Sequence, residues 1–118
     1  MCVHDAKVSS VLFSYIAVNG ILSCANKFIL QDFLRDYWGF ADDRWLVADC
    51  DVVLNIYITH NYTADPVQAA AVALLAGTDI DCGVYWAIFL PDGAFARGLM
   101  NTADLKRAVT LQYAFIVK

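Results

Sequence analysis

The sequence contains no glutamate, only two prolines and little charge. All twelve acidic residues are aspartates, and charged residues make up 17% of the 118 positions, against 60% hydrophobic residues. The chain has the length of one domain or part of one. A small domain normally covers its core with more polar groups than this, so we expect some apolar surface to stay exposed or to meet a partner.

The sequence also lacks the long apolar run of a membrane span. Its longest apolar runs, 69–76 and 84–90, fall short of the roughly 20 residues needed to cross a bilayer. The first residues contain no charged segment leading into a long apolar stretch, so no signal peptide is predicted in this chain. No basic cluster is interleaved with aromatic residues, and the net charge is −4. Neither a membrane nor nucleic acid is therefore expected as a partner.

A metal site is not indicated either. The four cysteines lie far apart and include no C-x-x-C pair of the kind that holds structural zinc: Cys2, Cys24, Cys50 and Cys82. We therefore predict no metal and no other cofactor. Asn61-Tyr62-Thr63 is an N-glycosylation triplet, which makes Asn61 a candidate glycosylation site and suggests a secretory history. Such triplets are also common by chance.

Three strands, each followed by a helix, are predicted from the spacing of the apolar residues. The strands are expected over 8–15, 45–48 and 78–83. The helices are expected over 25–38, 67–76, 84–97 and 102–118, with a start at Asp65-Pro66 for the second and an N-cap at Thr102 for the last. This alternation predicts an α/β fold with a parallel sheet, although three units are too few to close an eight-stranded barrel.

Polar side chains gather where the predicted strands end. In a parallel α/β sheet, the residues that follow the strands meet at one edge, where ligands bind. The residues in these positions are Tyr15, Asp49, Cys50, Asp51, Asp81 and Cys82. A helix cap for the aspartates and a packed rim for the tyrosine are the alternatives to a catalytic role.

Four segments of the sequence resemble conserved blocks of the fungal and plant β-xylosidases of glycoside hydrolase family 3. The segment 14–27 is similar to that family's S-Y-N-x-V-N-G-x-P-[ST]-C-A, and 34–40 is similar to L-R-x-x-W-G-[FW]. The segment 47–53 resembles V-S-D-C-D-x-V, and 76–83 resembles A-G-T-D-[IL]-D-C-G. The four blocks occur in the family's order and extend over most of the chain.

The resemblance implies a retaining glycosidase, in which a carboxylate attacks the anomeric carbon and a second carboxyl group protonates the leaving oxygen. Asp49 stands where the family has its nucleophile. Family members supply the acid/base as a glutamate from a later domain, and this chain contains none. Tyr15 matches a tyrosine that lines the subsite of the sugar whose bond is broken.

Cys50 and Cys82 are expected to form a disulfide. Each follows a predicted strand by the same register, and neighbouring strands lie about 4.8 Å apart, which is within the Cα range of a disulfide. The bridge would lie beside Asp49 and form part of the sugar-binding wall. Two small buried thiols are the alternative.

By this resemblance, residues 1–118 are the C-terminal portion of the family's catalytic barrel, a partial (β/α)8 TIM barrel without a linker. The predicted function is that of an exo-acting, extracellular β-xylosidase, whose substrate is a β-linked xyloside or xylo-oligosaccharide. The predicted protein partners are the remaining barrel strands and the later domain that supplies the glutamate. Self-association through exposed apolar edges is the alternative.

Three positions depart from the family pattern, because Ile16 replaces an asparagine, Leu22 a proline and Ala48 a serine. Loss of the asparagine removes both a donor and an acceptor near the sugar. A non-catalytic α/β module that retains the family framework is therefore one alternative function. A β-glucosidase or an α-L-arabinofuranosidase of the same family is another. The β-glucosidases generally carry a tryptophan where Cys50 stands, which favours the xylosidase.

Overall fold

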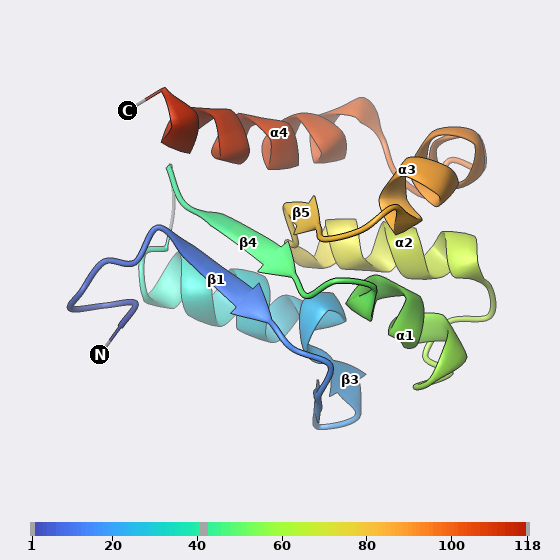
Figure 1. Ribbon diagram of the computed structural model, residues 1–118, viewed down its shortest axis with the longest axis horizontal. Coiled ribbons are helices and arrows are strands. Elements are labelled where there is room, and N and C mark those ends of the chain that lie inside the picture. Colours follow the sequence, from blue (N-terminus) through green and yellow to red (C-terminus); the bar gives the residue numbers. More distant parts are fainter. Residues whose placement is uncertain (1, 41–42, 118) are drawn as a thin grey trace.

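The computed structural model describes residues 2–40 and 43–117, in which strands and helices alternate (Figure 1). The strands are β1 (Ser10–Phe13), β2 (Ala17–Val18), β3 (Ile21–Leu22), β4 (Trp45–Ala48) and β5 (Ile80–Asp81). The α-helices are α1 (Val52–Ile58), α2 (Pro66–Ala76), α3 (Tyr85–Phe89) and α4 (Thr102–Ile116). A 3₁₀ turn, η1 (Ser23–Ala25), and two π-helices, η2 (Phe28–Tyr37) and η3 (Leu90–Phe95), complete the order. Over the described ranges, no helix has the length and apolar character of a membrane span.

Strands β1, β4 and β5 form a parallel sheet with β4 in the centre. Phe13 pairs with Ala48, and Ala48 pairs with Asp81, so the three strands end at the same level (Figure 1). Parallel strands need crossover connections, which contain η2 between β1 and β4 and α2 between β4 and β5. This arrangement confirms the expected α/β fold with a parallel sheet.

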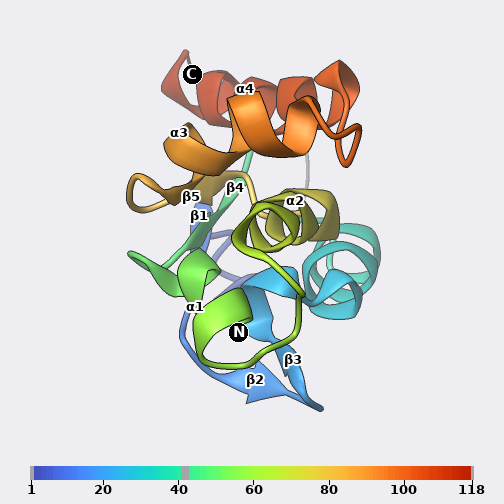
Figure 2. The same ribbon diagram turned by 90° about the vertical axis from the view of Figure 1, so that its right-hand side faces the viewer.

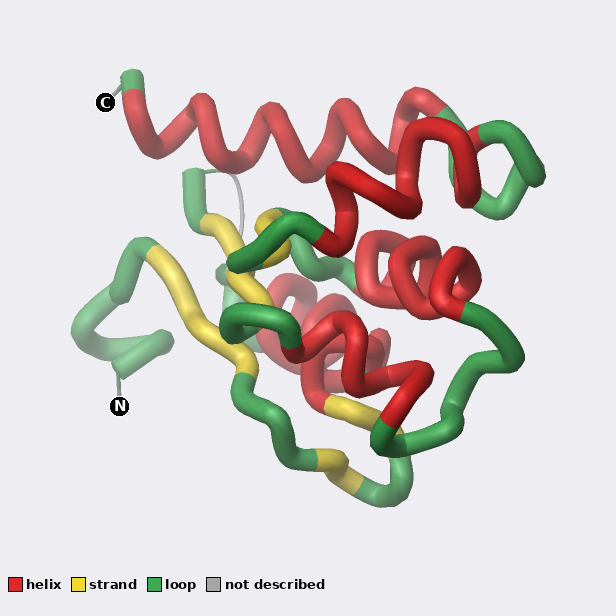
Figure 3. Tube along the Cα trace, turned by 45° about the vertical axis from the view of Figure 1, so that its right-hand side comes forward, coloured by secondary structure: helices red, strands yellow, loops and turns green. Residues whose placement is uncertain are grey.

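Helices cover one face of the sheet. Both η2 and α2 lie on the same side of β1 and β4 (Figures 1 and 2), and Leu46 and Ala48 of β4 are fully buried. The alanines of α2 let this helix approach closely, since Ala69, Ala70 and Ala73 are also fully buried. Leu12, which alternates with the buried Phe13 along β1, is 56% exposed. The second face of the sheet is therefore partly open, as Figure 3 also shows.

A buried ionic cluster holds the start of β5. Asp79 is 1% exposed, and its carboxylate forms ion pairs with Arg35 of η2 and Arg107 of α4. It also accepts a hydrogen bond of 2.8 Å from the backbone N–H of Leu46. Burial raises the pKa of Asp79, and the two guanidinium groups oppose this rise. The cluster therefore ties two helices to the sheet at the edge opposite the strand ends.

The turn signal at Asn19-Gly20 lies in a small hairpin. Strands β2 and β3 pair antiparallel, with Val18 opposite Ile21. Asn19 and Gly20 have φ angles of 52° and 81°, as a two-residue hairpin turn requires. The sequence analysis predicted a turn and a loop here but not the two short strands.

The prediction of the helices was wrong at two places. The segment after Asp51 was read as a loop, and the structure forms α1 there; its β-branched residues have low helix propensity, but Val52 and Ile56 are fully buried and packing decides. The single helix expected over 84–97 divides at Leu90 into α3 and the π-helix η3. Pro91, at the start of η3, has no N–H to continue the α-helical ladder.

The N-cap predicted for the last helix was also wrong by one residue. Asn101, not Thr102, caps α4, because its side-chain oxygen accepts hydrogen bonds from the backbone N–H groups of Ala103 and Asp104. The Asp104 carboxylate in turn accepts from the N–H of Asn101 at 2.8 Å, which completes a capping box. The predicted end of this helix, at residue 118, lies outside the described residues.

Candidate active site

Asp49 follows the central strand of the sheet directly and is half-buried. Its backbone N–H donates to the carbonyl oxygen of Phe13 at 2.9 Å, which extends the ladder between β4 and β1 by one residue. Its own carbonyl oxygen accepts from the N–H of Val52 at 3.0 Å. The backbone of Asp49 is therefore held by the end of β1 on one side and by the start of α1 on the other.

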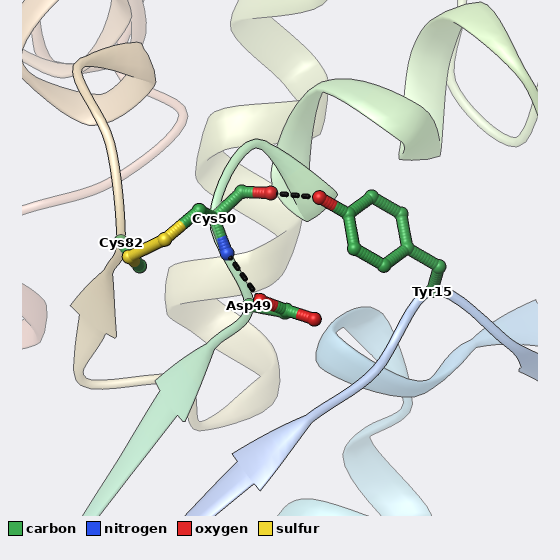
Figure 4. The surroundings of a disulfide bond; sticks show 4 residues. All are labelled: Tyr15, Asp49, Cys50 and Cys82. Atoms are coloured by element: carbon green, nitrogen blue, oxygen red, sulfur yellow. Dashed lines mark hydrogen bonds between the residues drawn. A yellow bond between two sulfur atoms is a disulfide. The ribbon is translucent and has the colours of Figure 1, made fainter.

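The Asp49 side chain is also oriented by its neighbour. One carboxylate oxygen, Oδ1, accepts a hydrogen bond of 2.8 Å from the N–H of Cys50 (Figure 4). Within the part of the chain that the structure describes, no hydrogen bond to the second oxygen is found. One oxygen is thus fixed, and the other is left for a reacting atom.

A disulfide joins the loop after β4 to the residue after β5. Cys50 and Cys82 are bonded, with their Cα atoms 4.2 Å apart (Figure 4). The N–H of Asp51 donates to the carbonyl oxygen of Cys82 at 3.1 Å, so backbone and side chains both link these two segments. The other two cysteines are free thiols: Cys2 is exposed, and burial raises the pKa of Cys24 to about 12.

Tyr15 reaches the same loop from the end of β1. Its hydroxyl group donates a hydrogen bond to the carbonyl oxygen of Cys50 (Figure 4). Partial burial raises the pKa of Tyr15, and the carboxylates of Asp49 and Asp51 act in the same direction. The phenol therefore stays protonated at neutral pH and remains a hydrogen-bond donor. The ends of all three strands converge on the residues around Asp49.

Two further residues shape this loop. Asp51 adopts a left-handed conformation (φ 64°) at the start of α1, with no hydrogen bond from its side chain to the helix N–H groups. A Cβ atom at Gly83 would come within 3.1 Å of the Asp51 carboxylate, so the close approach of the two loops needs a glycine. Gly83 was not singled out in the sequence analysis. Its place directly after Cys82 was the available signal.

Asp81 acts as a cap rather than as part of the open site. Its Oδ2 atom accepts from the N–H of Trp86 at 3.1 Å, at the start of α3. Burial raises the pKa of Asp81, and the charge of Asp51 adds to the effect. Its Oδ1 atom is buried without a hydrogen-bond partner among the described residues. The structure thus favours the capping alternative for this aspartate.

The site lies on the surface at the strand ends, apart from two hollows in the molecule. A cavity of about 330 Å³ is lined by apolar residues of α3, η3 and α4, such as Trp86 and Leu105. A shallower hollow of about 240 Å³ lies beside α2 and includes Tyr62 and Leu75. Within the described ranges, no group of three or more His, Cys or Asp residues could hold a metal ion. The chemistry available around Asp49 is therefore that of one oriented carboxylate.

The chain is similar to curated fungal enzymes over almost its whole length. It is 45% identical over 118 residues to the probable exo-1,4-β-xylosidase bxlB of Aspergillus terreus, covering 99% of this chain and 15% of that protein. It is 45% identical over 115 residues to the exo-1,4-β-xylosidase xlnD of Emericella nidulans, covering 98% of this chain and 14% of that protein. The chain thus spans about 15% of the length of the curated relatives that it matches. No family model matches it.

Solved structures share this arrangement of elements. A GH3 exo-β-xylosidase (XlnD), solved in complex with a xylobiose aziridine activity-based probe, superimposes with a TM-score of 0.92 at 45% identity, over 97% of this chain and 15% of that one. A β-glucosidase from Erythrobacter marinus gives a TM-score of 0.82 at 29% identity, over 96% of this chain and 15% of that one. The order and spacing of strands and helices around Asp49 therefore recur in much longer enzymes.

Proposed function

Because this chain belongs to glycoside hydrolase family 3 of the β-xylosidase type, we propose that it is the part of a retaining β-xylosidase that carries the nucleophile, Asp49. The observation that carries the proposal is the geometry of this carboxylate. It follows the central strand, its Oδ1 atom is fixed by the N–H of Cys50, and its second oxygen is open. A nucleophile needs this combination of a rigid backbone and one unengaged oxygen.

In the first step, the open oxygen of Asp49 forms a bond to the anomeric carbon of the xylose unit. The bond from that carbon to the leaving oxygen breaks, and its electron pair goes to that oxygen. An aryl leaving group departs as a stable phenolate without a proton, whereas the oxygen of a xylo-oligosaccharide needs one. Since this chain has no glutamate, that proton comes from an acid/base on a segment outside these residues, about 5–5.5 Å from Asp49 as in other retaining enzymes.

Tyr15 and the Cys50–Cys82 disulfide are proposed to form the wall against which this sugar binds. The proposal is supported by the hydrogen bond from the Tyr15 hydroxyl to the Cys50 carbonyl and by the disulfide beside it. Together they fix the loop that orients the Asp49 side chain. Both groups lie at the same end of the sheet as Asp49, and Tyr15 is 45% exposed, so its ring is available to contact a sugar.

The proposed substrate is a β-1,4-linked xyloside or xylo-oligosaccharide, cleaved from its end, and the proposed location is extracellular. The relatives named exo-1,4-β-xylosidase support this choice at 42–45% identity. A β-glucosidase shares 29% identity and the same fold, which makes a β-glucoside the main competing substrate. The partly open sheet face and its two edge strands are proposed to be completed by further barrel strands.

Hydrolysis of an aryl β-xyloside tests the proposal, with an Asp49→Ala variant beside the unchanged chain. The chain is expected to release phenolate in a burst of about one equivalent, because deglycosylation needs the absent acid/base. Asp49→Ala should release none. An aryl β-glucoside and an aryl α-L-arabinofuranoside, measured in parallel, should react more slowly. Equal phenolate release by both proteins, or none by either, would overturn the proposal; size-exclusion chromatography of the same samples reports whether association accompanies activity.

A further inference from the structure

We propose that Asn61 carries an N-linked oligosaccharide. Asn61-Tyr62-Thr63 is the one Asn-x-Ser/Thr triplet in the sequence. In the modification, the amide nitrogen of Asn61 forms a bond to the anomeric carbon of a lipid-linked oligosaccharide. The bond from that carbon to the lipid pyrophosphate breaks, the pyrophosphate leaves with the electron pair, and the amide loses one proton. The modification does not depend on the proposed hydrolase activity.

The structure leaves the Asn61 side chain accessible. Asn61 is exposed in the loop between α1 and α2, with φ 48°, a left-handed conformation that asparagine tolerates. The N–H of Tyr62 donates to the carbonyl oxygen of Ile56 at 2.9 Å, which fixes the backbone of the loop. Among the described residues, no hydrogen bond uses the Asn61 carboxamide. A glycan at this position therefore displaces no native contact.

An independent observation points to the same compartment. The Cys50–Cys82 disulfide forms and persists in oxidising environments such as the endoplasmic reticulum and the cell exterior. N-linked glycans are attached in that secretory compartment. Two separate chemical features of the chain thus require the same route, whereas a chance triplet in a cytosolic protein would stand without the disulfide.

The glycan would leave the candidate active site free. Asn61 lies beyond the far end of α1 from Asp49, and a helix of seven residues is about 10 Å long. The neighbouring Tyr62 is 46% exposed and lines the shallow hollow that also includes Leu75, itself 49% exposed. A hydrophilic glycan beside this apolar surface would keep that side of the molecule in solvent.

Translation of the chain behind a cleavable secretion leader, in the presence of microsomes, tests the proposal. The product should gain the mass of one oligosaccharide, and an endoglycosidase should remove it. Asn61→Asp keeps a side chain that tolerates the left-handed conformation but destroys the triplet, and this variant should gain nothing. Thr63→Ala should also gain nothing, whereas Thr63→Ser should still be modified.

Because transfer takes place on the emerging chain, a failure to fold does not obscure this result. A wild-type product without the added mass, in microsomes that modify a known acceptor, would overturn the proposal. A second measurement examines the folded state. The glycosylated product should form the Cys50–Cys82 disulfide, seen as a reductant-sensitive mobility on a gel, and its loss on glycosylation would show that the glycan and the fold are incompatible.

Discussion

The Tyr15 hydroxyl group donates a hydrogen bond to the carbonyl oxygen of Cys50, so the residue that follows β1 holds the residue that follows Asp49. The contact joins two segments that are 35 positions apart. Because the N–H of the same Cys50 donates to the Asp49 carboxylate, a change at Tyr15 is transmitted to the proposed nucleophile. This relationship makes Tyr15 a positioning residue as well as a candidate sugar contact.

Tyr15→Phe is expected to slow the reaction of Asp49 with an aryl β-xyloside by roughly a factor of two to ten, since one hydrogen bond is lost. The midpoint of urea unfolding should change little, because Tyr15 is 45% exposed. Tyr37→Phe is the matched control, since Tyr37 is 76% exposed and belongs to η2. An unchanged burst rate for Tyr15→Phe would contradict the positioning role.

Removal of the disulfide should destabilise the fold by roughly 3–4 kcal/mol, from the loop entropy that the crosslink removes in the unfolded chain. The sequence separation of Cys50 and Cys82 is 32 residues. The variant that replaces both by serine should therefore unfold at lower urea, and Cys2→Ser, which alters an exposed thiol, should not.

Reductant provides the internal check on this prediction. A thiol reductant should lower the urea midpoint of the wild-type chain and leave that of the double serine variant unchanged. If the wild-type midpoint does not respond to complete reduction, the disulfide does not contribute as described.

Asp79→Asn is expected to cost about 3–5 kcal/mol of unfolding free energy, because it leaves two guanidinium groups without their counter-ion in a buried site. Arg35 and Arg107 both pair with this carboxylate. Urea denaturation of the variant, with the exposed Asp92→Asn as a control for the loss of one charge, measures the effect. Equal midpoints for the two variants would contradict a structural role for the cluster.

The sequence identified the strands better than the helices. The apolar run of β4 lies between polar segments, and the structure forms a strand over the predicted residues 45–48. The helix α1 escaped prediction because its residues are mostly β-branched and its stability comes from burial of Val52 and Ile56, which no local signal reports. Tertiary packing therefore decided this element.

The arrangement of the site followed from the strand order, and its supports did not. Tyr15, Asp49 and Cys82 were expected at one edge because parallel strands end together, and the structure brings these three residues there. The Arg35–Asp79–Arg107 cluster was missed, because its members are far apart in sequence and each resembles a solvated charge. The one available signal was a charged residue at the start of an otherwise apolar strand.

Stability should fall in acid partly through Asp65. A side-chain hydrogen bond from Arg97, together with the N–H of Gln68, lowers the pKa of Asp65 below its usual 3.8. A carboxyl group with a lowered folded-state pKa stabilises the fold above its unfolded pKa, and this contribution is lost as the pH falls. Between about pH 5 and pH 3, the unfolding free energy should therefore fall more steeply for the wild type than for Asp65→Asn, which still caps α2. Parallel curves would contradict this assignment.

Covalent trapping on a single aspartate tests the central claim most directly. The chain is allowed to react with an aryl β-xyloside, quenched in acid and digested, and the modified peptide is located by mass spectrometry, with Asp49→Asn and Asp51→Asn treated in the same way. The account predicts one xylosyl group on Asp49, present in Asp51→Asn and absent in Asp49→Asn. A xylosyl group on Asp51 or Asp81, or one that persists in Asp49→Asn, would contradict it.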